Sequence, residues 1–170
     1  MKQKGYTLLE LLLVIAITGV IVTAVGSSIV LIMRGEPQMS EKSVSMADID
    51  NAAHWLTQDL VLAQTTTGLP LDGTPVTNPT TSNPVTINWS DLTAWAADAG
   101  SVQHSVTYYL SGTQLRRNYD GTETIVGKYL TNVSFSFNGA MFTVTLTSRS
   151  GWTGATVTRS FLIQKRSTGA

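Results

Sequence analysis

One carboxylate stands at the start of a long apolar run. Glu10 is followed by residues 11–33, in which no residue is charged and most are Leu, Val, Ile or Ala. The run is long enough to cross a bilayer core as a helix, which takes about 20 apolar residues at ~1.5 Å each. An ionisable side chain at the edge of such a segment is costly and indicates a function with a charged partner.

A short basic head precedes this segment. Lys2 and Lys4 are followed by Gly5, an arrangement that is also typical of a secretory signal or a plain membrane anchor. The apolar run continues to Met33, past the ~7–15 residues expected of a signal core. Two interpretations remain open at this point: a plain anchor, and a segment whose function requires Glu10.

The residues around the carboxylate form a motif, Lys4-Gly5-Tyr6-Thr7-Leu8-Leu9-Glu10-Leu11. This motif resembles the processing site of type IV prepilins and pseudopilins. The resemblance implies that a prepilin peptidase cleaves between Gly5 and Tyr6, that Tyr6 is then N-methylated, and that Glu10 is the fifth residue of the mature chain. The basic head would belong to a leader peptide of residues 1–5. Tyr6 departs from the family's usual Phe but keeps an aromatic ring.

The chemistry of the mature N-terminus suggests a role for Glu10. Methylation leaves the amine of Tyr6 positively charged. A lone ammonium and a lone carboxylate are both costly in apolar surroundings, and pairing relieves both. A pair within one helix is sterically allowed, whereas the resemblance implies a pair between neighbouring subunits that sets the register of entry into a filament. We predict that Glu10→Val leaves cleavage intact and impairs assembly.

Residues 6–33 are predicted to form one helix, the transmembrane and assembly segment, which positions Glu10. Residues 34–64 are predicted to form its second half, with a kink or short break at Gly35-Glu36-Pro37 because proline removes a helix hydrogen bond. Apolar residues in this half recur at spacings of three and four. They are Ile49, Ala52 or Ala53, Leu56, Leu60 and Ala63. This face is predicted to pack on a following sheet.

The composition of the chain changes at residue 65, and the spacing of its apolar residues changes at residue 85. Residues 65–84 hold four of the five prolines and are predicted to be an irregular surface linker. From residue 85 apolar residues alternate with polar ones, which predicts a β-rich domain over 85–170. The short spacings predict an antiparallel sheet, with a brief helical turn over 90–97, a hairpin over 104–119 and a hairpin turn at Asn138-Gly139. The fold class is α+β, of the type IV pilin-like kind that the resemblance implies.

Other reactive side chains form no known catalytic pattern. The absence of cysteine excludes disulfides and thiol chemistry. The acidic residues of the second helical half, Asp48, Asp50 and Asp59, are interpreted as a solvated helix face, and His54 and His104 have no partner at metal-ligand or catalytic spacing. Asp120-Gly121-Thr122-Glu123 is interpreted as a turn, since its spacing does not match an EF-hand. The sequence therefore predicts no catalytic residue, no metal ligand and no cofactor.

Charge is unevenly distributed along the chain. The formal net charge is zero, yet residues 36–98 hold eight acidic residues and one lysine, while 99–170 hold two acidic and seven basic residues. The two halves could attract each other within a molecule or between subunits, or form two solvated faces. One group could contact DNA in an uptake filament: Arg116 and Arg117 with Tyr108, Tyr109 and Tyr119. Such residues are also common on exposed sheet faces without that role.

These observations favour a structural protein over an enzyme. Three stretches resemble minor pilins, in particular the J-type minor pseudopilins and the PilW-like group: residues 55–60 followed by Ala63, and 106–110 with 115–117. The resemblance implies a subunit of a type IV pilus, a type II secretion pseudopilus or a DNA-uptake filament. Its partners would be prepilin peptidase, other pilin subunits and the inner-membrane assembly platform. The precursor would cross the cytoplasmic membrane once, with its C-terminal domain outside the cytoplasm, before joining a periplasmic or extracellular filament. The alternative is a bitopic, membrane-anchored extracellular binding module that never polymerises.

Overall fold

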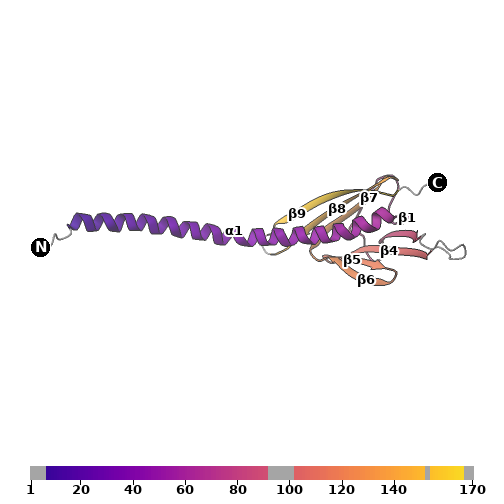
Figure 1. Ribbon diagram of the computed structural model, residues 1–170, viewed down its shortest axis with the longest axis horizontal. Coiled ribbons are helices and arrows are strands. Elements are labelled where there is room, and N and C mark those ends of the chain that lie inside the picture. Colours follow the sequence, from indigo (N-terminus) through magenta and orange to yellow (C-terminus); the bar gives the residue numbers. More distant parts are fainter. Residues whose placement is uncertain (1–6, 92–101, 152–153, 167–170) are drawn as a thin grey trace. The chain divides into compact units, whose positions relative to one another are not determined.

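The computed structural model describes residues 7–91, 102–151 and 154–166, without the side chains of 34–38 and of residue 91. It divides into two compact units, Met1–Ser40 and Glu41–Ala170. The helix α1 (Leu8–Leu62) contributes residues to both units (Figure 1). Each unit is described by itself.

The first unit is the N-terminal part of α1. Its start is marked by Thr7, whose carbonyl and hydroxyl oxygens accept the Glu10 N–H at 3.0 and 3.4 Å, the arrangement of an N-cap. The helix predicted over 6–33 therefore begins at Leu8, and Tyr6 lies outside the described residues. Within the apolar run, Thr18 and Ser27 donate their hydroxyls to carbonyls one turn earlier, at 2.7 and 2.5 Å. These polar groups are thus satisfied inside the helix, as a lipid environment requires.

Of the kink or short break predicted at Gly35-Glu36-Pro37, the break is wrong and the kink stays a prediction. The backbone stays helical from Leu8 to Leu62, across Pro37. Proline removes one N–H donor from the helix.

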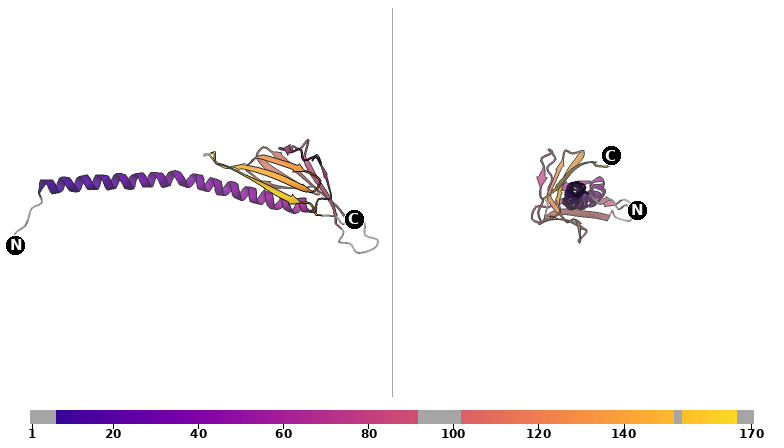
Figure 2. Two further views of the ribbon diagram at one scale, coloured as in Figure 1. Left: turned by 90° about the horizontal axis from the view of Figure 1, so that it is seen from above. Right: turned by 90° about the vertical axis from the view of Figure 1, so that its left-hand side faces the viewer.

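In the part of the chain that the structure describes, the second unit combines the C-terminal part of α1 with nine strands. They are β1 (Thr65–Thr67), β2 (Val76–Thr77), β3 (Val85–Asp91), β4 (Val102–Ser111), β5 (Gln114–Tyr119), β6 (Thr122–Gly127), β7 (Leu130–Phe137), β8 (Met141–Arg149) and β9 (Thr156–Gln164). They form two antiparallel sheets, in the orders β1-β3-β4-β5-β6 and β2-β7-β8-β9. The sequence predicted one sheet. Figures 1 and 2 show the two sheets around the C-terminal part of α1.

The predicted linker contributes to both sheets. Thr66 of β1 pairs with Ile87 of β3, and Val76 of β2 pairs with Phe135 of β7. Leu69, between these strands, is buried. Strands of two or three residues carry no periodic signal, and the prolines lie outside them, so composition alone indicated only irregular chain. The helical turn predicted over residues 90–97 is wrong at residues 90 and 91, because these two residues belong to β3. Residues 92–97 lie outside the described residues.

The core lies between the helix and the two sheets. The residues of the predicted apolar helix face are buried, both alternatives Ala52 and Ala53 included, together with inward-facing residues of both sheets. The hairpin predicted over 104–119 is confirmed as β4–β5, and Asn138-Gly139 lies in the β7–β8 turn. At the β5–β6 turn Asp120 and Gly121 both have positive φ, 47° and 90°, as a two-residue hairpin loop requires. This arrangement fixes the side chains of the helix against those of β3, β4 and β5.

Candidate processing and assembly site

The carboxylate of Glu10 is exposed in the first turn of α1. None of the described residues forms an ion pair or hydrogen bond with that carboxylate. Its position beside the free N–H groups of a helix start is electrostatically favourable. Lys2, Lys4, Gly5 and Tyr6 lie outside the described residues, so the predicted pairing and cleavage site remain predictions.

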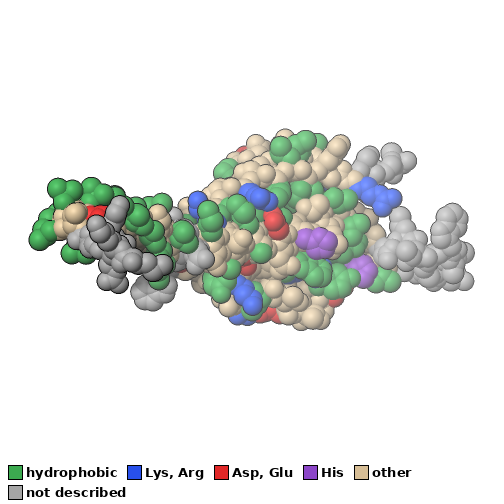
Figure 3. Space-filling model, turned by 60° about the vertical axis from the view of Figure 1, so that its left-hand side comes forward, with side chains coloured by type: hydrophobic (Ala, Val, Ile, Leu, Met, Phe, Trp, Pro, Cys, Tyr) green, Lys and Arg blue, Asp and Glu red, His purple; other side chains and the backbone are tan. Residues whose placement is uncertain are grey.

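The helix behind Glu10 presents an apolar surface on every side. Residues Leu8–Met33 have a mean hydropathy of 2.6 and none of the segment is buried within the molecule. At ~1.5 Å per residue the segment is about 39 Å long, more than the ~30 Å of a bilayer core. Figure 3 shows hydrophobic side chains gathered over it. A continuous apolar surface of this size requires lipid or protein to cover it.

The N-terminus matches a known family. Residues 1–26 match the family model described as the prokaryotic N-terminal methylation motif. This motif is the signature of type IV prepilins, so the chain carries the N-terminal segment of a type IV pilin-like precursor, the class that prepilin peptidase processes. No curated protein matches the chain, and no solved structure does. The α+β architecture, with a long N-terminal helix followed by antiparallel sheets, fits this class.

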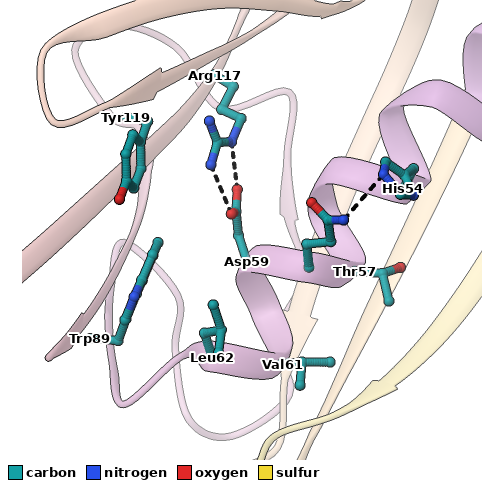
Figure 4. A pocket seen from close by; sticks show the side chains of 9 residues that line it. His54, Thr57, Asp59, Val61, Leu62, Trp89, Arg117 and Tyr119 are labelled. Atoms are coloured by element: carbon teal, nitrogen blue, oxygen red, sulfur yellow. Dashed lines mark hydrogen bonds and ion pairs between the residues drawn. The ribbon is translucent and has the colours of Figure 1, made fainter. Parts of the chain in front are cut away.

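The structure corrects the interpretation of Asp59, which is buried rather than solvated. Its carboxylate accepts hydrogen bonds from Arg117 Nε and Nη2 at 2.7 and 2.9 Å (Figure 4). It also accepts a hydrogen bond from the hydroxyl of Tyr108. The hydrogen bond to Asp59 raises the pKa of Arg117, and burial raises the pKa of Tyr108. The guanidinium also lies 4.8 Å from the ring of Trp55 and 4.9 Å from that of Tyr119. These contacts tie α1 to β4 and β5.

A sequence signal for this pair existed. Asp59 directly precedes Leu60 and lies three residues after Leu56, both of them buried. A carboxylate at the edge of an apolar helical stripe needs a partner when the stripe packs, because an unpaired buried charge is very costly. The partner itself could not be read from the sequence, since it lies 58 positions further along the chain.

The proposed DNA-contacting group does not form one exposed face. Tyr108 is fully buried and Arg117 is paired with Asp59. On the opposite side of the sheet, the Arg116 guanidinium and the Tyr109 hydroxyl both donate to Glu123. These hydrogen bonds, that of Tyr109 first, lower the pKa of Glu123. The expectation of a shared exposed surface was therefore wrong for Tyr108 and Arg117.

Two further acidic residues of α1, Asp48 and Asp50, also have partners. Asp48 accepts the backbone N–H groups of Lys128 and Tyr129 at 2.6 and 2.9 Å, and Asp50 pairs with Arg159 at 2.7 Å. Together with the Asp59 pair, these contacts join the acidic half of the sequence to the basic half within one molecule. They favour the intramolecular interpretation of the charge pattern over two solvated faces.

The histidines have different surroundings. His54 is exposed and its Nε2 lies 3.2 Å from Gln58 Nε2, whereas His104 Nδ1 lies 2.8 Å from Asp120 Oδ2 and 2.9 Å from the Tyr119 hydroxyl. The hydrogen bond to His104 lowers the pKa of Asp120. Within the described ranges, no group of three His, Cys, Asp or Glu residues could hold a metal ion.

Proposed function

We propose that the chain is a structural subunit, a minor pilin or pseudopilin, of a type IV pilus, type II secretion or DNA-uptake filament. The observation that carries the proposal is the combination of the methylation motif with a fully exposed apolar helix whose single carboxylate has no partner among the described residues. A helix of this kind is stable in lipid before assembly. In a filament, helices of neighbouring subunits replace the lipid.

The proposed mechanism follows from charge pairing. Prepilin peptidase hydrolyses the bond between Gly5 and Tyr6 and so creates a new amine, which stays cationic after methylation. A neighbouring subunit's Glu10 carboxylate accepts this cation in an apolar surrounding, where an unpaired charge of either sign is strongly unfavourable. The pair sets the axial position of one subunit against the next. The assembly platform of the inner membrane would present the two helices to each other.

The experiment separates processing from assembly. We expect Glu10→Gln and Glu10→Val precursors to be cleaved normally, giving an N-terminus at methylated Tyr6 by intact mass, and to be depleted from sheared filaments. Glu123→Gln is the matched control, because it removes an exposed carboxylate of the second unit, and it should be incorporated normally.

Two results would contradict the proposal. Normal incorporation of Glu10→Val would remove the role of the carboxylate. A native chain that still begins at Met1 would instead support the bitopic binding module, in which the N-terminus is uncut and Glu10 is dispensable.

A further inference from the structure

The turn between β7 and β8 contains an asparagine that is directly followed by a glycine. Asn138, Gly139 and Ala140 are all exposed, and Met141 begins β8. The backbone nitrogen of a residue can attack the side-chain amide of an asparagine before it, and a side chain on the attacking residue hinders this approach. Gly139 has no side chain, and apart from its chain neighbours no atom lies within 4 Å of the place that a Cβ would occupy. The turn belongs to the second unit and is independent of the N-terminal motif.

Two hydrogen bonds hold the side-chain carbonyl of Asn138 in this turn. Its Oδ1 accepts the backbone N–H of Ala140 at 3.3 Å and that of Met141 at 2.9 Å. Attack on an amide carbon places negative charge on the carbonyl oxygen, and backbone N–H groups that already point at this oxygen stabilise the charge. The two donors therefore favour addition of a nucleophile to Cγ of Asn138.

The attacking nitrogen and the leaving group are free. Within the described ranges, neither the backbone N–H of Gly139 nor Nδ2 of Asn138 has a hydrogen-bond partner. Both belong to exposed residues, so hydroxide can remove the proton of the first and water can supply a proton to the second. The turn thus combines a polarised amide carbon, an unhindered nitrogen and an unrestrained leaving group.

We propose that Asn138 deamidates through Gly139 in the folded protein, a covalent modification that goes beyond the proposed structural role. The Gly139 nitrogen loses its proton to hydroxide and forms a bond to Cγ of Asn138. The Cγ–Nδ2 bond breaks, Nδ2 takes a proton from water and leaves as ammonia, and a cyclic succinimide remains. Water then opens the succinimide at either carbonyl, so the whole reaction consumes one water, releases one ammonia and needs no oxidant or reductant.

The two ring-opening products affect the hairpin differently. An aspartate keeps a side-chain oxygen for the Met141 N–H and adds a negative charge to an exposed turn. An isoaspartate carries the main chain through the former side chain, which lengthens the turn by one carbon and removes that acceptor. The adjacent pair of the ladder is Phe137 with Phe142, whose buried rings are stacked with their centroids 4.2 Å apart. Isoaspartate formation therefore loosens the core at this end of the sheet.

The test follows the full chain in detergent micelles, incubated at neutral and mildly alkaline pH in water enriched in a heavy oxygen isotope. Peptide mass spectrometry locates each amide that has become an acid, and enzymatic methylation identifies isoaspartate. Asn118 is the matched internal control, because its Oδ1 also accepts a backbone N–H of a turn, that of Gly121 at 2.9 Å, while the residue after it is Tyr119. A sample unfolded in guanidinium chloride gives the reactivity without the turn.

A variant tests the role of the glycine. Gly139→Ala places a methyl group beside the attacking nitrogen, and near-UV circular dichroism checks that the variant is folded. It should slow the reaction at Asn138 and leave Asn118 unchanged. If the variant does not fold, the comparison of Asn138 with Asn118 in the wild type decides the outcome.

We expect the folded wild type to incorporate the isotope at Asn138 and to form isoaspartate there, at a rate that rises with pH and exceeds that at Asn118 at least about tenfold. The isoaspartate fraction, separated by chromatography, should unfold at a lower denaturant concentration. The proposal is overturned if Asn138 keeps its amide in the folded chain while the unfolded chain loses it, if Asn118 reacts as fast, or if folded Gly139→Ala reacts as fast as the wild type. An unchanged unfolding midpoint of the isoaspartate fraction would overturn the loosening of the core.

Discussion

The buried ion pair between Asp59 and Arg117 should contribute far more to stability than the exposed pair on the same helix. Asp59→Ala leaves the Arg117 guanidinium buried without its counter-charge and deprives the Tyr108 hydroxyl of its acceptor. Removal of one partner from a buried pair costs about 3–5 kcal/mol. For a domain of this size we expect the Tm to fall by roughly 10–20 °C.

Asp50→Ala is the matched control. Asp50 lies on the same helix and also binds an arginine of the sheets, but its side chain is 56% exposed and that of Arg159 is 43% exposed. Exposed pairs contribute about 0–1 kcal/mol. The two aspartate variants thus remove the same group from the same helix in two different surroundings.

The assay is chemical unfolding of the full chain in detergent micelles, followed by near-UV circular dichroism. That signal reports the packing of the second unit, where all aromatic residues of the core lie. A third variant, Asp59→Leu/Arg117→Met/Tyr108→Phe, replaces the whole polar network with apolar side chains and should recover most of the lost stability. The reasoning is refuted if Asp59→Ala costs no more than Asp50→Ala, or if the triple variant is less stable than Asp59→Ala.

Two further predictions concern the turns and the outer sheet face. The hydrogen bond from Tyr109 lowers the pKa of Glu123 below its ordinary 4.5, so the contribution of the Glu123 carboxylate to stability is present above pH 4.5 and is lost as the pH falls through the lower folded-state pKa. Glu123→Gln should therefore reduce the loss of stability on acidification, measured by unfolding curves from pH 7 downward. An unchanged loss of stability in this variant would contradict the prediction. Gly68 has a φ of +82° and an added Cβ would lie 2.3 Å from the carbonyl oxygen of Pro84, so Gly68→Ala should cost about 3 kcal/mol or more. Gly112→Ala, at φ +63° in open space, should cost only about 1–2 kcal/mol, and equal losses for the two would show that the close contact is unimportant.

Local patterns in the sequence predicted the helices and strands in which apolar residues recur at one regular spacing. The helical spacing of Ile49, Leu56 and Leu60 identified the buried helix face, and the alternation around Asn138-Gly139 identified a hairpin. Both follow from the geometry of a single element, 3.6 residues per helical turn and two per strand repeat. The motif around Glu10 was equally local and is confirmed as a methylation motif.

Features that depend on distant partners could not be predicted in this way. The pairing of Thr66 with Ile87, or of Asp59 with Arg117, is decided by how the sheets pack. The division into two sheets has the same origin, because the consecutive strands β6 and β7 belong to different sheets and pair with different neighbours. At Pro37 the local rule was outweighed by the cooperativity of a long helix.

The C-terminal part of the second unit, residues 150–165, is hydrogen-bonded to residues 41–64 at the start of that unit, and this has a consequence for how the chain folds. Contacts of Ser150 with Glu41, Arg159 with Asp50 and Lys165 with Gln64 join residues 101 to 109 positions apart. Contacts at such separation slow folding, because the loop must close before they form. At synthesis rates of ~5–20 residues per second, β9 is synthesised roughly 5–20 s after the part of α1 that belongs to the second unit.

During that interval the unfinished domain exposes the face that later becomes its core. If the second unit is exported across a membrane, as the proposed function requires, an incomplete sheet emerges before the folded domain, and a chaperone or protease has access to it during that interval. Folding is completed only by residues near the C-terminus, so a truncation there would expose the helix that lies near the N-terminal boundary of the unit.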